Sequence, residues 1–418
     1  MKILVITPYL PYANAPHGGS AILFRLLHEL AQSHQIFLAT MYEPDEVAKL
    51  DEVQTLFKLV CAEPKRESAL VAFQARRSSL NSHLRSLRTL LVSAAQYAAT
   101  FFGIYARAYP DQKAFLQRTV QAIAAVQPDI IQIEYGYFCR LFARTLAPYG
   151  VTVGVAHDVE FKPARRMALA AKGLDRLAAW MRYAFIRRAE LKAYRYVRKV
   201  YALSAFDAEL LRNAAPSLSV GVRRSSVDTP SFDVRTCRRE DNMILFVGAL
   251  YRPENLSAVH FLICEVMPLV WQKVPEAHVH LVGAGASHDF LQHVQGLPVV
   301  VHGYQERLAD FYMRATLAVV PLFVGGGIIV KLLDALAYGV PTVATSIANE
   351  GVGAMPERDI LIADDAPAFA QQILCLLHSP ERRASLSEHA HAFVRQAFNA
   401  QESAAQLIAD YTALLAKF

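Results

Sequence analysis

Apolar positions along the chain alternate between short β-branched runs and longer stretches with helical spacing. The first run is residues 3–7 (ILVIT), and from Ser20 apolar residues recur at helical intervals through SAILFRLLHELAQSH. A second short run follows at residues 35–40. A strand, a helix and a strand in this order predict a βαβ unit, which implies a parallel sheet.

The same alternation continues through both halves of the chain. Further strands are expected at residues 129–133, 151–156, 200–203, 243–247, 278–282, 299–301, 317–321 and 341–344. Helices are expected at residues 163–198, from Ala205, at 255–270 and at 401–418. Repeated units of this kind predict doubly wound α/β sheets.

One stretch, from Pro216 to Asn242, breaks the pattern, because it is rich in Ser, Pro and charged residues and has little periodicity. We expect a linker there. The predicted organisation is therefore a first Rossmann-like domain at 1–215, the linker at 216–242, a second Rossmann-like domain at 243–395 and a closing segment at 396–418.

The composition supports two folded domains and an anionic partner. The 418 residues are 54% hydrophobic and 19% charged, which supplies a sizeable core and excludes global disorder. The net charge of +6 favours a nucleotide, a nucleic acid or an acidic lipid as partner. The five cysteines are scattered without a CxxC pair, so we expect reduced thiols that mostly fill the core of a cytoplasmic protein.

Two features bear on membranes. Met1 and Lys2 run straight into the first strand, so no secretory leader is expected. Residues 89–106 carry no charge over about the length of a membrane span, but Thr, Ser, Gln and Gly dilute the stretch. We expect a buried or surface-docked helix there rather than a transmembrane one.

Ligands of open parallel sheets bind at the carboxyl ends of the strands, and two sets of candidate residues stand there in the first half. Gly18 and Gly19 lie just before a predicted helix, where close backbone approach and free N–H groups suit an anion; a plain flexible turn is the alternative. His157, Asp158 and Glu160 follow a predicted strand. His157 can donate to a hydroxyl or phosphate, and the two carboxylates can accept or act as a base; a surface loop without such a role is the alternative.

The strongest local signal is PLFVGGGIIVKLLDALAYGVP at residues 321–341. We expect Gly325, Gly326 and Gly327 to open a helix and present backbone N–H groups to an anion. Lys331 can then reach a diphosphate, and Asp334, on the same helix face, can accept ribose hydroxyls. An ordinary surface pair of Lys331 with Asp334 is the alternative reading.

Other ligand motifs find little support. The run Gly283-Ala284-Gly285 is not a full GxGxxG, and no GxxxxGK[ST] P-loop occurs. The histidines include His389-Ala-His391 but no HxxxH pair, and we expect neither a Cys/His cluster nor a bound metal.

These residues resemble the GT-B glycosyltransferases of family four, a large bacterial group of retaining sugar transferases. The resemblance is best from Phe246 to Gly285 (FVGALYRPENLSAVHFLICEVMPLVWQKVPEAHVHLVGAG) and from Val301 to Thr345, and thinner over residues 1–210. It implies two Rossmann-like doubly wound domains facing an interdomain cleft, with the closing helix returning to the first domain. Gly18-Gly19 and His157-Asp158 match the glycines and the HD element of the family's acceptor domain.

The resemblance also assigns residues of the donor side. Asp334 stands at the second glutamate of the family's E-x7-E motif, while Gly326 stands at the first, as in a branch with a GGG-x3-K signature. Lys331 corresponds to the diphosphate lysine. The usual arginine is replaced by Ala249, and Arg252 is the candidate substitute. Tyr304 stands where the family holds the nucleobase.

The implied activity is retaining, metal-independent transfer of a sugar, typically a hexose, from a nucleoside-diphosphate sugar to a glycan or lipid-linked acceptor. Lys331, the Gly325–Gly327 amides and Arg252 would stabilise the leaving diphosphate, with no cofactor. Two alternatives stay open. One is an inactive GT-B-like scaffold, supported by Gly326 and Ala249; the other is a sugar-nucleotide epimerase on the same fold.

Basic residues with interleaved aromatics decorate the predicted helix at 163–198, and more precede residue 89. An anionic membrane surface is a candidate partner, with the protein peripheral on the inner face of the cytoplasmic membrane. A solvated helix face is the alternative. Nucleic acid is not expected, because no recognised nucleic-acid module is present.

Overall fold

The computed structural model describes residues 1–13, 15, 17–65, 110–227 and 233–417, which form two compact units. The first unit comprises Met1–Arg223 and Gln401–Phe418, and the second comprises Arg224–Ala400. The uncharged stretch at 89–106 and the basic residues before it lie outside the described residues.

The first unit is built on a seven-stranded parallel sheet with the order β3-β2-β1-β4-β5-β6-β7. Its strands are β1 (Lys2–Thr7), β2 (Gln35–Tyr42), β3 (Lys58–Pro64), β4 (Ile130–Glu134), β5 (Val151–Ala156), β6 (Lys199–Ala202) and β7 (Val220–Val222). The chain moves outward to β3, then returns to place β4 against β1, which pairs Ile3 with Ile130. This reversal confirms the doubly wound topology that the sequence predicts.

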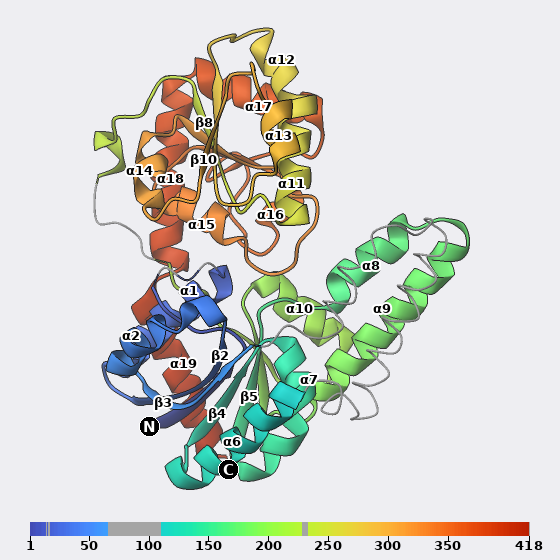
Figure 1. The fold of residues 1–418 in the computed structure, drawn as a ribbon, viewed down its shortest axis with the longest axis vertical. Helices are drawn as coiled ribbons and strands as arrows, with labels where there is room; N and C mark the ends of the chain where they lie inside the picture. The colour runs from blue at the N-terminus through green and yellow to red at the C-terminus, as the bar shows by residue number, and fades with distance from the viewer. Residues whose placement is uncertain (14, 16, 66–109, 228–232, 418) are drawn as a thin grey trace. The chain divides into compact units, whose positions relative to one another are not determined.

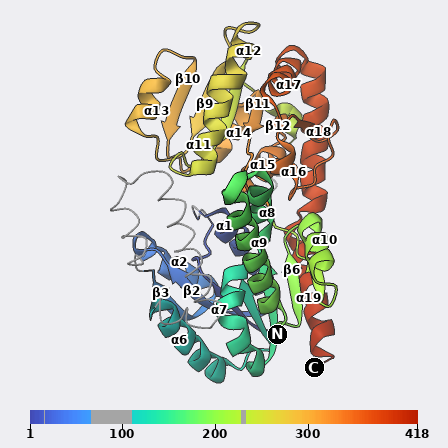
Figure 2. The same ribbon diagram turned by 90° about the vertical axis from the view of Figure 1, so that its right-hand side faces the viewer.

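Helices lie on both sides of this sheet (Figures 1 and 2). They are α1 (Gly18–Ala31), α2 (Lys49–Leu56), α6 (Pro110–Val126), α7 (Gly136–Leu146), α8 (Phe161–Ala170), α9 (Gly173–Tyr194) and α10 (Ala205–Ala214), with short 3-10 turns at Pro44–Glu46 and Ala147–Tyr149. The helical stretch expected at 163–198 is divided into the two helices α8 and α9. The chain breaks between α8 and α9, where Lys172 is extended and Gly173 takes a left-handed φ of 58°.

Two segments near the unit boundary complete the first unit. Residues 220–222, expected in the linker, instead form β7, which pairs with β6 at the sheet edge. The closing helix α19 (Ala400–Leu415) also lies in this unit. The Tyr411 hydroxyl donates to Oε1 of buried Gln132 on β4 over 2.5 Å, and Lys199 on β6 pairs with Asp410 at 2.7 Å. These contacts attach the end of the chain to the first sheet.

The second unit repeats the architecture with a six-stranded parallel sheet, ordered β10-β9-β8-β11-β12-β13. Its strands are β8 (Met243–Val247), β9 (His278–Val282), β10 (Val299–Gly303), β11 (Leu317–Val320), β12 (Thr342–Ala344) and β13 (Leu361–Ile362). The first five correspond to predicted strands, and β13 was missed because only two residues pair. The two Rossmann-like sheets confirm the predicted fold of each half.

The helices of the second unit are α11 (Pro253–His260), α12 (Met267–Trp271), α13 (His288–His293), α14 (Leu308–Arg314), α15 (Val330–Ala337), α16 (Ser346–Asn349), α17 (Ala366–His378) and α18 (Pro380–Ala397), with a 3-10 turn at Val234–Thr236. A π-helical segment, η4 (Phe261–Val266), joins α11 to α12. The helix expected at 255–270 is therefore one longer helical run with a widened turn in its middle.

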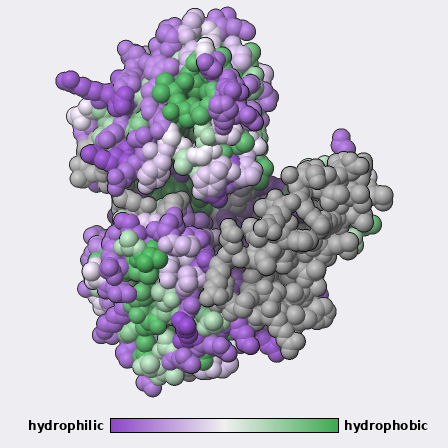
Figure 3. Space-filling view, viewed as in Figure 1, coloured by the Kyte–Doolittle hydropathy of each residue, from purple (hydrophilic) through white to green (hydrophobic). Residues whose placement is uncertain are grey.

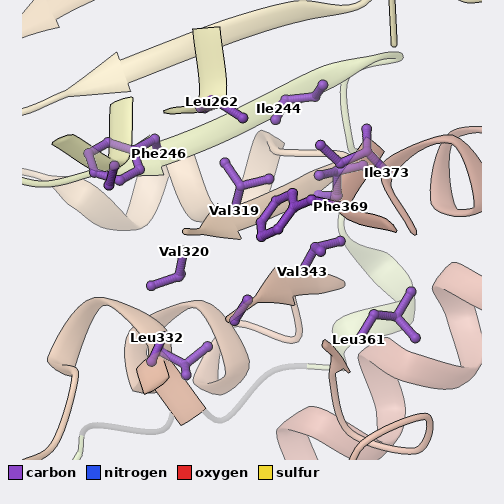
Figure 4. Close-up of a cluster of buried hydrophobic side chains, with 14 of the residues drawn as sticks. Ile244, Phe246, Leu262, Val319, Val320, Leu332, Val343, Leu361, Phe369 and Ile373 are labelled. Atoms are coloured by element: carbon purple, nitrogen blue, oxygen red, sulfur yellow. The ribbon is translucent and has the colours of Figure 1, made fainter. Parts of the chain in front are cut away.

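The core of the second unit lies between its sheet and its helices (Figure 4). Phe246 on β8, Val319 on β11 and Val343 on β12 are fully or almost fully buried with Phe369 and Ile373 of α17. A fully buried side chain of this size contributes about 1.5–3 kcal/mol. This packing fixes the helices and loops that follow the strands.

The surface and the cysteines test two further expectations from the sequence. Hydrophilic residues make up most of the visible surface of the second unit on the face in Figure 3. Within the described residues, no helix is both long and apolar enough to cross a bilayer. All five cysteines are free, but only Cys61 and Cys139 are buried, so the expectation that most of them fill the core is wrong.

Candidate functional site

In the second unit, β8 and β11 lie side by side although β9 follows β8 in sequence. The connections that leave these two strands therefore diverge in opposite directions, and their carboxyl ends form the switch point where doubly wound sheets bind ligands. Residues 248–252 lead from β8 to α11, and residues 321–329 lead from β11 to α15.

Lys331, the second residue of α15, places its ammonium at this switch point. Its Nζ donates a 2.6 Å hydrogen bond to Oδ1 of Asn255 on α11. It also lies 4.5 Å from the centre of the Phe246 ring on β8, which is cation–π distance. Lys331, which follows β11, thus contacts both β8 and the helix α11 that comes after it.

Asn255 is itself held in one orientation. Its Nδ2 donates to the carbonyl oxygen of Ala249 over 2.8 Å, so Oδ1 is the atom turned toward Lys331. The assignment follows because only the amide nitrogen can donate to a carbonyl. The hydrogen bonds of Asn255 connect the loop after β8 with the start of α15.

Glycines allow this close approach. A methyl group on Gly248 would lie 2.4 Å from the Lys331 Nζ and 2.9 Å from the Asn255 Nδ2. A methyl group on Gly283, just after β9, would lie 2.1 Å from the carbonyl oxygen of Gly248. The run Gly283-Ala284-Gly285 is therefore explained by packing of the loop after β8, with Gly285 against Tyr251.

The surroundings of Lys331 disfavour the charged form of its side chain. Burial, followed by the nearby charge of Arg252, lowers the pKa of Lys331 to about 7. Glu254 acts in the opposite direction, but its effect is smaller. An ammonium that is costly to keep charged gains most from an anionic partner placed beside it.

The glycine loop lies before the helix rather than opening it. Helix α15 begins at Val330, so Gly325–Gly327 precede it by two residues, and the expectation that the glycines open the helix is wrong. Gly327 has a left-handed φ of 66°, and its carbonyl oxygen would lie 2.0 Å from a methyl group on Gly351. The loop turns sharply because it packs against the segment after α16.

The other predicted donor-side residues lie on neighbouring elements. Asp334 is partly buried in the middle of α15 and, after burial itself, contributes to raising the pKa of Tyr312. Arg252 is exposed just before α11 and pairs with Glu254 at 2.9 Å. Tyr304 follows β10 with 68% of its surface exposed.

The first unit carries a second cluster at the corresponding edge of its sheet. Glu134, the last residue of β4, is completely buried and accepts two hydrogen bonds from Arg223, at 2.6 Å and 3.1 Å. It also accepts one from His157 Nε2 at 2.5 Å. Burial opposes ionisation of Glu134, but Arg223 and His157 outweigh it and lower its pKa to about 2.

This network fixes the His157 ring. Because Glu134 is ionised it can only accept, so His157 Nε2 carries the proton and Nδ1 is an acceptor in the neutral ring. The ring stacks on Tyr135 with centroids 3.7 Å apart and planes 8° from parallel. Tyr135 has a φ of 69°, and such a conformation in a residue other than glycine stores about 1–3 kcal/mol and clusters at functional sites.

Gly19, in the first turn of α1, is explained by this cluster. A methyl group on Gly19 would lie 2.2 Å from the Tyr135 hydroxyl and 3.1 Å from His157 Nδ1. The Tyr135 hydroxyl also lies 3.3 Å from His17 Nδ1, in the residue before Gly18 and the helix. The structure therefore places Gly19 beside His157, with Gly18 as its neighbour at the start of α1.

The two carboxylates after β5 have separate surroundings. Asp158 is exposed, whereas Glu160 forms an ion pair with Arg140. The fully buried Glu190 accepts from the backbone N–H groups of Glu160 and Phe161, both at 3.2 Å. Burial, followed by the charge of Glu160, raises the pKa of Glu190 to about 8.

Sequence reasoning missed the residues that orient these clusters. Glu134 immediately follows a predicted strand, as His157 does. Its position at a strand end was therefore the signal that could have identified it. Arg223 lay in the expected linker, and Asn255 lay inside a predicted helix. For these two, the sequence offers no signal of the contact, because their partners are distant along the chain.

Comparison with known proteins agrees with this architecture. Residues 241–379, all within the second unit, match the family of glycosyl transferases group 1. An uncharacterised 44.6 kDa protein in the cps region of Klebsiella pneumoniae is 24% identical over 179 residues, which is 41% of this chain. The match spans 45% of that relative, somewhat under half its length.

Solved structures match almost the whole chain. The sucrose-phosphate synthase of Thermosynechococcus elongatus superposes with a TM-score of 0.70 at 15% identity, covering 100% of both chains. HepE of Anabaena, in complex with UDP and glucose, gives 0.65 at 13%, covering 99% of this chain and 100% of its own. TarM of S. aureus gives 0.66 at 11%, covering 98% and 99%.

Together these findings define the fold of the chain. It is that of the GT-B glycosyltransferases, with two Rossmann-like sheets and their helices. Residues 241–379 match the family of glycosyl transferases group 1, which are enzymes of sugar transfer.

Proposed function

We propose that this protein transfers a sugar, of the hexose type, from a nucleoside-diphosphate sugar to a glycan or lipid-linked acceptor. The observation that carries the proposal is the Lys331 ammonium, held between Asn255 and Phe246 at the switch point of the second sheet. A diphosphate placed there would meet this cation and the N-terminus of α15. UDP is the first candidate nucleotide, because HepE is described in complex with UDP and with UDP-glucose.

The chemistry follows from where charge develops. As the bond between the sugar and the diphosphate breaks, negative charge accumulates on the leaving oxygen, and Lys331 and the backbone N–H groups of Gly325–Gly327 stabilise it. Arg252 lies close enough to Lys331 to influence its pKa and supplies a second cation. Asp334 would accept from the ribose hydroxyls, and Tyr304 would lie beside the base. These groups would stabilise the charge without a metal.

We assign the acceptor side to the cluster in the first unit. His157, oriented by Glu134 and stacked on Tyr135, would accept from or donate to a sugar hydroxyl. Asp158, exposed after β5, would act beside His157, and Glu160 is the third candidate on that loop. Departure and attack on the same face of the sugar would retain the anomeric configuration.

We further propose that the protein works in the cytoplasm, where its acceptor is carried on an anionic membrane. Four large apolar side chains on α8 and α9 are more than half exposed, among basic residues of the same helices: Met167, Leu169, Leu177 and Met181. Such a surface suits peripheral attachment. The matched relative from a cps region supports an acceptor used in polysaccharide assembly. Binding to anionic vesicles should fall steeply with salt, and salt-independent binding would contradict the electrostatic part.

The direct test is turnover. The full chain is incubated with UDP-glucose and other nucleotide sugars, with and without glycan acceptors, and the released nucleoside diphosphate is measured. We expect release from one donor class, and Lys331→Ala to reduce it about 100-fold or more, as loss of one charge-stabilising group does. Arg307→Ala, an exposed cation of the same unit paired with Asp310, is the control and should be active. Conversion of the donor to an isomeric nucleotide sugar, without net release of nucleoside diphosphate, would favour an epimerase, and no turnover of any donor would favour an inactive scaffold.

A further inference from the structure

We propose that His260, Cys264 and His293 bind a divalent transition metal of the zinc type on the surface of the second unit. Their ligand atoms all lie within 4.8 Å of one another. The Cys264 sulfur is 3.9 Å from His260 Nδ1 and 3.4 Å from His293 Nε2. The proposal is independent of the sugar-transfer site, since it rests on different residues.

The spacing fits a tetrahedral centre. Zinc binds nitrogen at about 2.0–2.1 Å and sulfur at about 2.3 Å, which places tetrahedral nitrogen and sulfur ligands about 3.6 Å apart. The two sulfur–nitrogen distances of 3.4 Å and 3.9 Å lie on either side of that value. Side-chain rotations would bring the three atoms, which lie within 4.8 Å of one another, around one ion.

The fold brings the three residues together from two connections. His260 ends α11, and Cys264 is one helical turn later in the π-helical segment η4. His293 ends α13, which follows the next strand of the sheet. Figures 1 and 2 both show α11 and α13 as neighbours. The expectation of no Cys/His cluster is therefore wrong, and the missed signal is the helical spacing in His260-x3-Cys264.

The donor set determines the class of ion. One thiolate with two imidazoles suits zinc and the similar ions cobalt and nickel, whereas magnesium and calcium prefer oxygen. All three side chains are exposed, so a water molecule can take the fourth position. The His260 ring also contacts the edge of buried Phe290, with centroids 6.1 Å apart, which limits its movement.

Binding would have a structural consequence. The ion would connect the helical run after β8 with the helix after β9, in addition to the hydrophobic packing between them. We therefore expect it to stabilise the second unit without taking part in the chemistry at Lys331. Because cysteine binds as the thiolate, binding would release a proton and tighten as pH rises.

The test uses the full chain, stripped with a chelator and titrated with cobalt(II) and with zinc(II). We expect about one ion per chain, a cobalt–thiolate charge-transfer band, and a rise in the unfolding temperature with zinc. Cys264→Ser should abolish the band, and His293→Ala should weaken binding by more than the roughly 10- to 100-fold that loss of a supporting hydrogen bond costs. The matched controls are Cys375→Ser and His389→Ala, which change an exposed cysteine and an exposed histidine elsewhere in the unit.

Two results would overturn the proposal. One is the absence of a cobalt–thiolate band in the full chain. The other is a band or a zinc affinity that falls equally in Cys264→Ser and Cys375→Ser, since this would show binding to any exposed thiol. Both readouts are spectroscopic or thermodynamic, so they do not depend on sugar transfer. A protein inactive in transfer but binding cobalt through Cys264 would still support the metal site.

Discussion

Lys331 and Asn255 come from different connections of the second sheet, yet Nζ of one donates to Oδ1 of the other over 2.6 Å. The same asparagine donates to the carbonyl oxygen of Ala249, so its acceptor cannot turn away without breaking that bond. The ammonium is thereby held at the switch point before any ligand arrives. A pre-positioned charge of this kind needs little reorganisation when a diphosphate binds.

The position of Gly248 yields the first prediction. In Gly248→Ala the added methyl group would lie 2.4 Å from Nζ, so the ammonium must move. We expect nucleoside-diphosphate binding to weaken by about 1.5–3 kcal/mol, which is a typical contribution of a hydrogen bond to a charged group. Calorimetric titration measures the effect. In a Lys331→Ala background the same change should cost almost nothing, and additive losses would contradict the assignment.

The lowered pKa of Lys331 predicts a pH dependence of binding. The free protein loses the Lys331 proton as pH rises through about 7. A bound diphosphate favours the charged form and raises that pKa, so binding above pH 7 takes up a proton. The contribution of Lys331 to affinity should therefore be constant below about pH 7 and fall by up to about tenfold per pH unit above it. Titration calorimetry in buffers of different ionisation enthalpy measures the uptake, which Lys331→Met should eliminate.

The same pKa predicts a stability effect. Because the folded pKa of Lys331 is below its unfolded value of 10.5, the unfolded chain binds more protons between about pH 7 and 10.5. The contribution of Lys331 to the free energy of unfolding therefore increases with pH in that window, by at most about 1.4 kcal/mol per unit. The free energy of unfolding, measured in urea at several pH values, should increase less with pH in Lys331→Met than in the unmodified protein. If the free energy of unfolding increases equally with pH in the two proteins, the pKa of Lys331 is not lowered in the folded state.

Glu134 leads to a prediction for the first unit. Glu134→Gln would leave the buried guanidinium of Arg223 without its charged partner, and we expect a loss of about 3–5 kcal/mol in the free energy of unfolding at pH 7. The pKa of Glu134 is lowered to about 2, so this stabilisation is complete above pH 4.5 and declines as pH falls toward 2. The difference in the free energy of unfolding between the unmodified protein and Glu134→Gln should therefore become smaller as pH falls from 4.5 toward 2.

The control for Glu134→Gln is Asp310→Asn, which breaks an exposed pair with Arg307. It should cost less than about 1 kcal/mol. Chemical unfolding followed by circular dichroism compares the variants. Comparable losses in the two would mean that the Glu134 network does not hold the first unit together.

Gly19 and Tyr135 provide a test of local packing. In Gly19→Ala the methyl group would lie 2.2 Å from the Tyr135 hydroxyl oxygen, so the stacked rings must shift. We expect a destabilisation of about 1–3 kcal/mol, typical of overpacking. Adding Tyr135→Phe removes the clashing oxygen and should restore part of the loss, whereas Tyr135→Phe alone should cost about 1 kcal/mol. A double variant no better than Gly19→Ala would show that another contact dominates.

The sequence was sufficient to predict the inner strands of both sheets, because hydrophobic runs such as residues 151–156 and 243–247 coincide with β5 and β8, but it missed the edge strands β3, β7 and β13. It was less informative where a single residue determines the local backbone conformation. The break at Gly173 and the start of α15 after the glycine loop depend on local φ and tertiary packing. Neither is visible in hydrophobic spacing alone.

The candidate site shows the same division. Lys331 and His157 could be found from the sequence because they follow strand ends beside glycines or helix starts. Asn255, Glu134 and Arg223, which hold them in place, could not. Their contacts bridge up to 89 positions along the chain and exist only once the sheets have formed.

Thermal unfolding with a panel of UDP, GDP, ADP and CMP shows whether Lys331 marks a nucleoside-diphosphate site. A ligand at 100 times its dissociation constant adds about 2.7 kcal/mol to the free energy of unfolding. We expect one nucleoside diphosphate, UDP first, to raise the unfolding temperature of the full chain. Lys331→Ala should abolish the rise, while Arg307→Ala should preserve it. A panel without any shift, or a shift of equal size in Lys331→Ala, would mean that Lys331 does not hold a nucleoside diphosphate.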